Sequence, residues 1–253
     1  MHRFFLPPNQ CQGPTLFLTG GEAHHALHVL RVSRGQRVTV LDGTGHEFLC
    51  EVQEYNRDKV SLSVAKKNSL PPWSCRLTLL QAIPKGKVME TIVQKATELG
   101  ASRVVPLLSE RVVAQFDQKE AVRKARKWQQ VAIEALKQCG SVWLPQIEAP
   151  LTPAQFLARN ELFELPLVAS LQSDSRSARE YFRAFQAERD RLPDSVCVWI
   201  GPEGDFTAAE LAAIQSHGAL PITLGRLVLR TDTAAVFCLS VVNHELYSVS
   251  DGR

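Results

Sequence analysis

Hydrophobic and polar residues alternate along the first part of the chain, from about residue 36 to residue 65. The runs "RVTVL" and "KVSLSV" have the two-residue period of half-buried strands, and "DGTG" between them is a turn signal. Before these strands, "GGEAHHALHVLRV" has the pattern of one short helix. We therefore predict a small antiparallel sheet or barrel, interrupted by a helix, in this region.

The pattern changes after "LPPWS", where two prolines block regular structure. Apolar runs of strand length then alternate with amphipathic helical segments; "RLTLLQA", for example, precedes "VMETIVQKATELG", which ends at Gly100. Such alternation predicts an α/β domain with a largely parallel sheet covered on both faces. We place the boundary near Pro71, giving domains of residues 1–72 and 73–253.

Composition narrows the class of protein. Hydrophobic residues make up 45% of the 253 positions, yet no apolar stretch approaches a membrane span, and the N-terminal apolar run is too short for a signal peptide. We therefore expect a cytoplasmic protein. The six cysteines contain no C-x-x-C pair and several lie in apolar runs, which favours buried reduced thiols over a zinc site or disulfides.

The net charge of +3 is unevenly distributed. Residues 76–145 carry 12 basic and 6 acidic side chains, and the densest basic run is "QKEAVRKARKWQQ". This run reads as a helix with Val122, Ala125, Trp128 and Ala132 on one side. Its basic side is either a solvated helix face or a surface for phosphate contacts.

Two glycine-containing loops follow strands in the C-terminal half. In "IGPEGDFTAAE", Gly201 and Gly204 allow a sharp turn, and Thr207 with Glu210 predicts a capping box that starts a helix. The sequence of a P-loop is absent, so this turn alone is either a ligand-binding loop or a tight link. The second loop, "LGRLVLRTDTAAV", also turns at a glycine, and ligands of parallel sheets bind beyond the carboxyl ends of the strands.

The segments "IVQKATELGASRVVPLLSER", "IGPEGDFTAAE" and "LGRLVLRTDTA", in this order, resemble the ribosomal RNA small subunit methyltransferase E family of the SPOUT class. The resemblance covers essentially the whole chain. It implies a PUA-like β-barrel that binds RNA, followed by a SPOUT α/β domain with a C-terminal trefoil knot. It further implies a homodimer that uses S-adenosylmethionine to methylate N3 of a uridine in 16S ribosomal RNA. The RNA substrate is then either free 16S RNA or the small ribosomal subunit.

The resemblance also implies where the cofactor lies. Three loops would surround it: the end of "VASL", the "IGPEG" turn and "LGRLVLR". The cofactor-binding residues expected on this basis are Ser170, Leu171, Ile200, Gly201, Pro202, Glu203, Gly204, Leu224, Gly225 and Leu229.

The chemistry of N3 methylation requires removal of a proton, because uridine N3 is a poor nucleophile while protonated. We hypothesise that Arg230 stabilises the resulting anion and that Asp232 accepts the proton or orients Arg230. The alternatives are a phosphate or surface contact for Arg230 and a helix N-cap for Asp232.

Several basic residues are candidates for RNA contacts: Arg3, Arg31, Arg34, Lys85 and Arg226. His24 and His28 stand four residues apart, but without an acidic or thiol partner we expect no metal site.

Three positions depart from the usual family pattern. Asp205 stands where a second glycine is common, Asp232 where glutamate is common, and Ser141 where an arginine is usual. These departures keep open a non-catalytic RNA-binding factor of ribosome assembly. A ribose 2′-O-methyltransferase of the same class is the other alternative.

Overall fold

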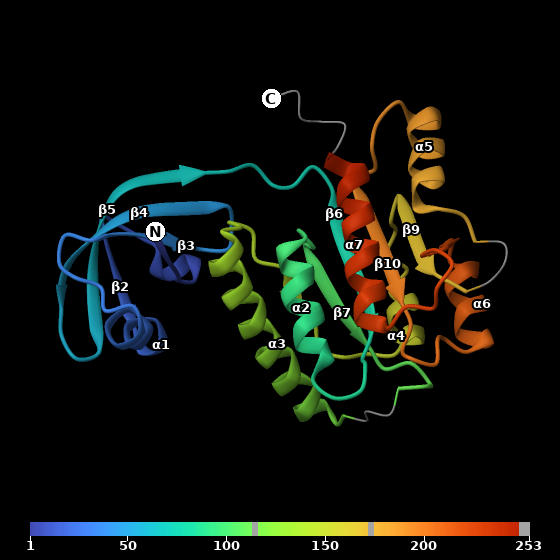
Figure 1. Ribbon diagram of the computed structural model, residues 1–253, viewed down its shortest axis with the longest axis horizontal. Helices are drawn as coiled ribbons and strands as arrows, with labels where there is room; N and C mark the ends of the chain where they lie inside the picture. Colours follow the sequence, from blue (N-terminus) through green and yellow to red (C-terminus); the bar gives the residue numbers. More distant parts are fainter. Residues whose placement is uncertain (113–115, 172–174, 248–253) are drawn as a thin grey trace. The chain divides into compact units, whose positions relative to one another are not determined.

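A computed structural model describes residues 1–112, 116–171 and 175–247 of the chain (Figure 1). The chain divides into two compact units. The first consists of Met1–Pro72 with Ile133–Leu144, and the second of Trp73–Ala132 with Pro145–Arg253. None of the helices in the described residues is long and apolar enough to cross a membrane.

The first unit is built on a five-stranded sheet with the order β1-β3-β4-β5-β2. As the alternating pattern predicts, neighbouring strands are antiparallel, except for β1, which pairs with β3 in parallel. The strands are β1 (His2–Phe5), β2 (Thr15–Thr19), β3 (Arg37–Leu41), β4 (His46–Tyr55) and β5 (Lys59–Ser69).

Short helices connect the strands of this unit. A 3₁₀ turn, η1 (Pro8–Gln10), follows β1, and the predicted helix after β2 consists of α1 (Gly20–His24) and a π-helical turn, η2 (His25–Val29). Ala23 and Ala26 of this helix are buried in one core with inward-facing strand residues such as Phe4 and Leu62. Burial of every second strand residue therefore fixes which face of the sheet is covered.

The end of a long helix, α3 (Gln118–Cys139), completes the first unit. The buried Lys137 ammonium lies 2.7 Å from a Glu22 carboxylate oxygen and 2.9 Å from a Glu134 oxygen. Burial alone would lower the pKa of Lys137, but hydrogen bonds to Glu134 and Glu22 raise it above its usual value. The Arg3 guanidinium donates to the carbonyls of Lys137 and Gln138, which lie at the helix C-terminus.

The second unit contains a six-stranded sheet with the order β11-β9-β10-β6-β7-β8, and all its pairs are parallel. The predicted α/β class with a parallel sheet is therefore confirmed. The strands are β6 (Arg76–Ala82), β7 (Arg103–Leu107), β8 (Gln146–Ile147), β9 (Leu165–Ala169), β10 (Ser195–Ile200) and β11 (Leu220–Ile222).

Helices cover both faces of this sheet (Figure 1). Ala82 of β6 and Trp199 of β10 pack in one core with Phe156 of α4 and Leu211 of α6. Because side chains alternate along a strand, Gln81 lies on the opposite face, where it bonds to a residue of α7. The helices of this unit, besides α3, are α2 (Val88–Glu98), α4 (Pro153–Leu157), α5 (Ala178–Arg189), α6 (Ala208–Ser216) and α7 (Thr231–Tyr247).

The capping residues and the glycine predicted at helix ends have these roles in the structure. Thr207 caps α6 through a capping box with Glu210, and Gly100 after α2 has φ +78°. The sequence did not predict β8 or α4, since elements of two and five residues are too short to show a period. The trefoil knot stays a prediction.

The thiols behave as small apolar side chains. Cys50, Cys75, Cys197 and Cys238 are buried, as their apolar neighbours in the sequence predict. Burial raises the pKa of each of these four thiols to about 12. They therefore remain protonated at neutral pH and do not act as nucleophiles.

Gly45 offers a test of packing in the first unit. Its φ is +96°, and an added Cβ would overlap the ring of Trp143, so we expect Gly45→Ala to lower the free energy of unfolding. Backbone strain accounts for about 1–2 kcal/mol, and the overlap adds about 1–3 kcal/mol. Gly35 is the matched control, because its φ is +81° but a Cβ there has nothing within 4 Å. Equal losses for Gly35→Ala and Gly45→Ala in urea unfolding would contradict the role of Trp143.

Candidate active site

A cavity of about 310 Å³ lies where the loops after β9, β10 and β11 meet. These strands are neighbours in the sheet, and the carboxyl ends of parallel strands share one edge, so their loops converge there. The cavity is lined by Ala169, Ser170, Leu171, Ile200, Gly201, Pro202, Glu203, Asp205, Thr223, Leu224, Gly225, Arg226, Leu227, Val228, Leu229, Thr231 and Ala234.

Nine of the ten residues expected to bind the cofactor line this cavity. The exception is Gly204, which lies in the same loop without lining the cavity and whose carbonyl accepts a hydrogen bond from the Arg111 guanidinium. The three loops that the family resemblance implies therefore form one common cavity.

The loop after β10 folds back tightly on itself. A Cβ at Gly201 would lie 2.8 Å from Oδ1 of Asp205, so only glycine fits there without a shift. The Asp205 amide donates to the Pro202 carbonyl at 2.9 Å. Asp205 has φ +61°, and its Oδ1 accepts from the Phe206 amide at 2.8 Å. Aspartate tolerates this left-handed backbone because its short side chain bonds locally.

The loop after β11 contributes mainly apolar surface. Gly225 has φ +107°, and its amide donates to the Thr223 hydroxyl at 3.2 Å. The next residues of the loop, Leu227 and Val228, are 77% and 79% exposed although they line the cavity. Exposed apolar side chains around a cavity indicate a surface that a ligand with apolar parts would cover.

A chain of hydrogen bonds ties the start of α7 to the sheet and to the loop after β10. The buried Gln81 amide donates from Nε2 to the Thr231 hydroxyl at 3.0 Å, and this hydroxyl donates to the Gly201 carbonyl at 2.8 Å. Gln81 Nε2 also donates to the Ala82 carbonyl at 2.8 Å. Two walls of the cavity are thereby fixed relative to each other.

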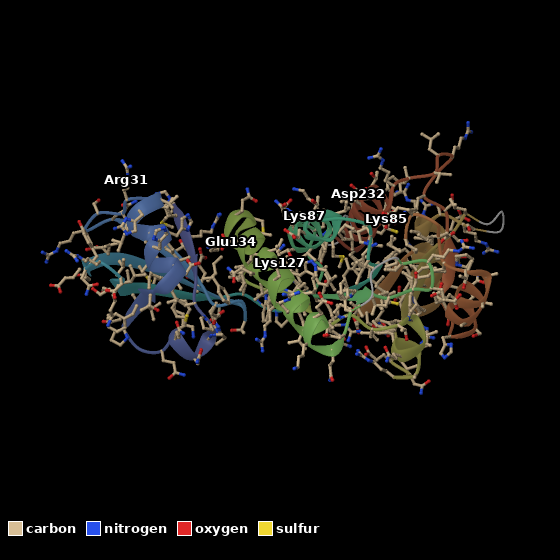
Figure 2. The ribbon with its side chains drawn as sticks, turned by 90° about the horizontal axis from the view of Figure 1, so that it is seen from below. Arg31, Lys85, Lys87, Lys127, Glu134 and Asp232 are labelled. Atoms are coloured by element: carbon tan, nitrogen blue, oxygen red, sulfur yellow. The ribbon has the colours of Figure 1, made fainter. Side chains whose placement is uncertain are left out.

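The two residues predicted to be catalytic lie beside the cavity and do not line it. Arg230 stands between Leu229 and Thr231, which do line it; the Arg230 side chain is exposed, and its carbonyl accepts from the Ala234 amide at 2.8 Å. Asp232 is half-buried in the first turn of α7 (Figure 2). A carboxylate at this helix end is favoured by the helix dipole.

The residues predicted to contact RNA differ in their surroundings. Arg31 and Arg34 are exposed in the first unit, and Figure 2 shows Arg31 pointing away from the ribbon. Lys85 and Arg226 are exposed in the second unit, where Arg226 lines the cavity. The Arg3 guanidinium is bonded through one nitrogen to the C-terminal carbonyls of α3, and its predicted contact with RNA stays a prediction.

Ser141 has a structural role. Its hydroxyl accepts from the Trp143 amide at 3.2 Å and donates to the Trp143 carbonyl at 3.1 Å. The His24 and His28 rings lie 4.8 Å apart between centroids. Within the described parts of the chain, no group of three or more His, Cys, Asp or Glu residues is arranged to hold a metal ion.

Sequence reasoning gave no role to Gln81 or Thr231. The signal for Gln81 is a single amide near the end of the apolar strand "RLTLLQA", since a buried polar side chain needs a hydrogen-bond partner. Thr231 belongs to the segment "LGRLVLRTDTAAV", but nothing in the local sequence indicates that its hydroxyl bonds to residues 150 and 30 positions away.

Comparisons with known proteins match both units. Residues 71–243 match an RNA methyltransferase domain, and residues 18–65 match an RNA methyltransferase PUA domain, so the predicted PUA-like part of the fold is confirmed. The chain is 32% identical over 251 residues to the ribosomal RNA small subunit methyltransferase E of Bacillus subtilis, covering 97% of each chain.

Solved structures agree with this match. A Legionella pneumophila protein described as a methyltransferase, in complex with the cofactor SAM, is 32% identical; the alignment covers 95% of this chain and 96% of that chain, with a TM-score of 0.84. The fold is also that of a ribosomal RNA small subunit methyltransferase E from Neisseria gonorrhoeae, at 24% identity, coverage of 96% of each chain and a TM-score of 0.81.

Replacing Thr231 with valine tests the hydrogen-bond chain. Valine has nearly the same shape but no hydroxyl, so the buried Gln81 amide and Gly201 carbonyl lose their shared partner. We expect Thr231→Val to lower the free energy of unfolding of the second unit by about 1–3 kcal/mol. Thr231→Ser retains the hydroxyl and is the control, so a valine variant no less stable than the serine variant in urea would contradict the assignment.

Proposed function

Because the chain belongs to the ribosomal RNA small subunit methyltransferase E family, we propose that it transfers a methyl group from S-adenosylmethionine to N3 of a uridine in 16S ribosomal RNA. One observation carries this proposal: three successive strand-end loops form a single cavity whose lining includes nine of the ten expected cofactor residues. The Legionella pneumophila relative with SAM bound supports the same cofactor for this chain.

The residues around the cavity fit this cofactor. Apolar side chains such as Leu171, Leu224 and Leu229 suit an adenine ring, and the free backbone of the glycine loops can bond to its edges. The Glu203 and Asp205 carboxylates suit the positive charges of the cofactor. The Arg226 guanidinium, which is also predicted to contact RNA, suits the carboxylate of the cofactor. When bound, the cofactor supplies an electrophilic methyl group attached to a sulfonium.

The remaining task of the protein is to make N3 nucleophilic and to place it in line with the methyl group. Arg230 follows a residue that lines the cavity, and its exposed side chain is free to meet the RNA base. We assign to its guanidinium the stabilisation of negative charge on O2 and O4 as the N3 proton leaves. Asp232, two residues further on, accepts this proton or orients Arg230.

The other partners follow from the same family. The PUA-like unit carries exposed Arg31 and Arg34, which we assign to contacts with RNA phosphates outside the catalytic site. We also propose that the protein acts in the cytoplasm as a homodimer, which sedimentation would test.

Methyl transfer to RNA is the direct test of this proposal. The protein is incubated with labelled S-adenosylmethionine and either small ribosomal subunits or 16S RNA lacking the modification, and the labelled nucleoside is then identified and mapped. We expect 3-methyluridine at one position. A 2′-O-methylated nucleoside would show instead that the protein is a ribose methyltransferase. If the protein binds RNA but transfers no methyl group, and calorimetry detects no binding of S-adenosylmethionine, it is a non-catalytic assembly factor.

Substitution of Arg230 separates chemistry from binding. Loss of a group that stabilises charge only in the transition state lowers kcat by about 10²–10³-fold, so we expect this decrease for Arg230→Ala. The dissociation constant of S-adenosylmethionine should change little, because Arg230 does not line the cavity. Arg183→Ala removes another exposed arginine, on α5, as a control. A parallel loss of cofactor affinity in Arg230→Ala would show that Arg230 has a structural role instead.

A further inference from the structure

A second cavity of the same unit, of about 390 Å³, is rich in lysine. We call it the lysine cavity; it is lined by Ile83, Pro84, Lys85, Gly86, Lys87, Met89, Glu90, Phe116, Lys124, Lys127, Trp128 and Glu203. Lys85 and Lys87 belong to the loop between β6 and α2, whereas Lys124 and Lys127 come from α3 (Figure 2 labels Lys85, Lys87 and Lys127). Four positive charges from two segments distant in the sequence thus surround one hollow.

Each acidic side chain of this cavity already has one partner in the protein, and the four lysines outnumber the two carboxylates. Glu90 lies 2.5 Å from the Lys127 ammonium, and a Glu203 oxygen accepts from the backbone amide of Lys85 at 3.0 Å. No ion pair involves the side chains of Lys85, Lys87 or Lys124 in the portions of the chain that the structure describes. An anionic ligand would therefore find three cations without a competing internal partner.

The lysine cavity also has an aromatic component. Trp128 is 4% exposed and forms part of its wall, and the Lys124 ammonium lies 5.6 Å from the ring centroid of half-buried Phe116. Trp128 is too buried to stack on a base, but a lysine beside a partly exposed ring such as Phe116 is typical of surfaces that follow a single nucleic-acid strand.

The position of Glu203 connects this cavity with the cofactor cavity. Glu203 lines both, and its bond to the Lys85 amide joins the loop after β6 to the loop after β10. A base presented to the cofactor cavity remains attached to its own phosphates, which must lie close by. A hollow that is positively charged and shares a wall with the cofactor cavity is suited to hold them.

We propose that the lysine cavity binds phosphate groups of the RNA strand next to the target nucleotide, with Lys87 and Lys124 as two of the phosphate ligands. This inference rests on the proposed function and adds to it the place where the RNA strand enters the catalytic unit. It also gives the basic residues of α3 different roles. Lys124 and Lys127 line the cavity, whereas Arg123 lies 3.1 Å from Glu120 in an ion pair.

The test compares the full-length protein with Lys87→Gln/Lys124→Gln, using an unmodified 16S RNA transcript. RNA affinity is measured by filter binding at several salt concentrations. For single-stranded RNA, each lost phosphate contact reduces the slope of log affinity against log salt by about 0.7, so the double variant should lose about 1.4. The KM for RNA should rise by about tenfold or more at moderate salt, whereas the dissociation constant of S-adenosylmethionine stays the same.

Two control variants make the result specific. Lys119→Gln removes an exposed lysine of α3 that does not line the cavity, and it should leave the salt slope unchanged. Lys87→Arg/Lys124→Arg retains both positive charges, so its slope of log affinity against log salt should be close to that of the wild type. If the two lysines had a purely structural role, retaining the charge would not be enough to restore the slope. Thermal unfolding confirms that every variant is folded.

The outcomes separate this inference from the proposed function. A wild-type slope and RNA affinity in the double glutamine variant, with methyl transfer intact, would overturn the lysine cavity alone. RNA binding that depends on Lys87 and Lys124, but without methyl transfer by the wild type, would support the cavity and overturn the proposed function.

Discussion

The arrangement of the catalytic unit depends on one buried hydroxyl. Thr231 at the start of α7 receives a hydrogen bond from Gln81 of β6 and donates one to Gly201, at the end of β10. Both bonds are buried or partly buried, so no water easily replaces them. The loop after β11 ends at Thr231, and the loop after β10 begins at Gly201; both loops line the cavity. The hydrogen bonds of Thr231 therefore fix the start of α7, and with it the position of Arg230, relative to the loop after β10.

Local patterns in the sequence predicted the outline of the fold, and the family resemblance pointed to the three loops that form the candidate cofactor cavity. Alternation gave the strands of the first unit, and glycine turns after buried strands located two of the three loops. Residues joined across long separations were not predictable in this way. Gln81 and Thr231 are 150 positions apart, and the lysine cavity combines the loop before α2 with one side of α3. Helical period showed which residues of α3 share a side, but not what that side faces.

Arg3 shows that the sequence does not reveal which partners a charged side chain has within the protein. The positive charge of Arg3 predicts a phosphate contact, which stays a prediction, and the structure shows in addition that its guanidinium bonds to carbonyls at the end of α3. A Cβ at Gly140 would lie 2.8 Å from that guanidinium, so the two residues fit each other closely. Charge alone does not distinguish a side chain that caps a helix from one that awaits a ligand, since both roles use the same donors.

Asp205 and Ser141, which raised doubt about the family's chemistry, have local explanations. The backbone at Asp205 has φ +61°, a conformation that glycine adopts freely and that aspartate reaches when its side chain bonds nearby, as Oδ1 does to the Phe206 amide. Aspartate therefore adopts here a backbone conformation that glycine also reaches, and it adds a carboxylate to the cavity wall. The Ser141 hydroxyl likewise bonds locally, to the backbone of Trp143 two residues further on. Asp232, the third departure, has one methylene fewer than glutamate, so its proposed role in proton transfer is the one that depends on side-chain reach.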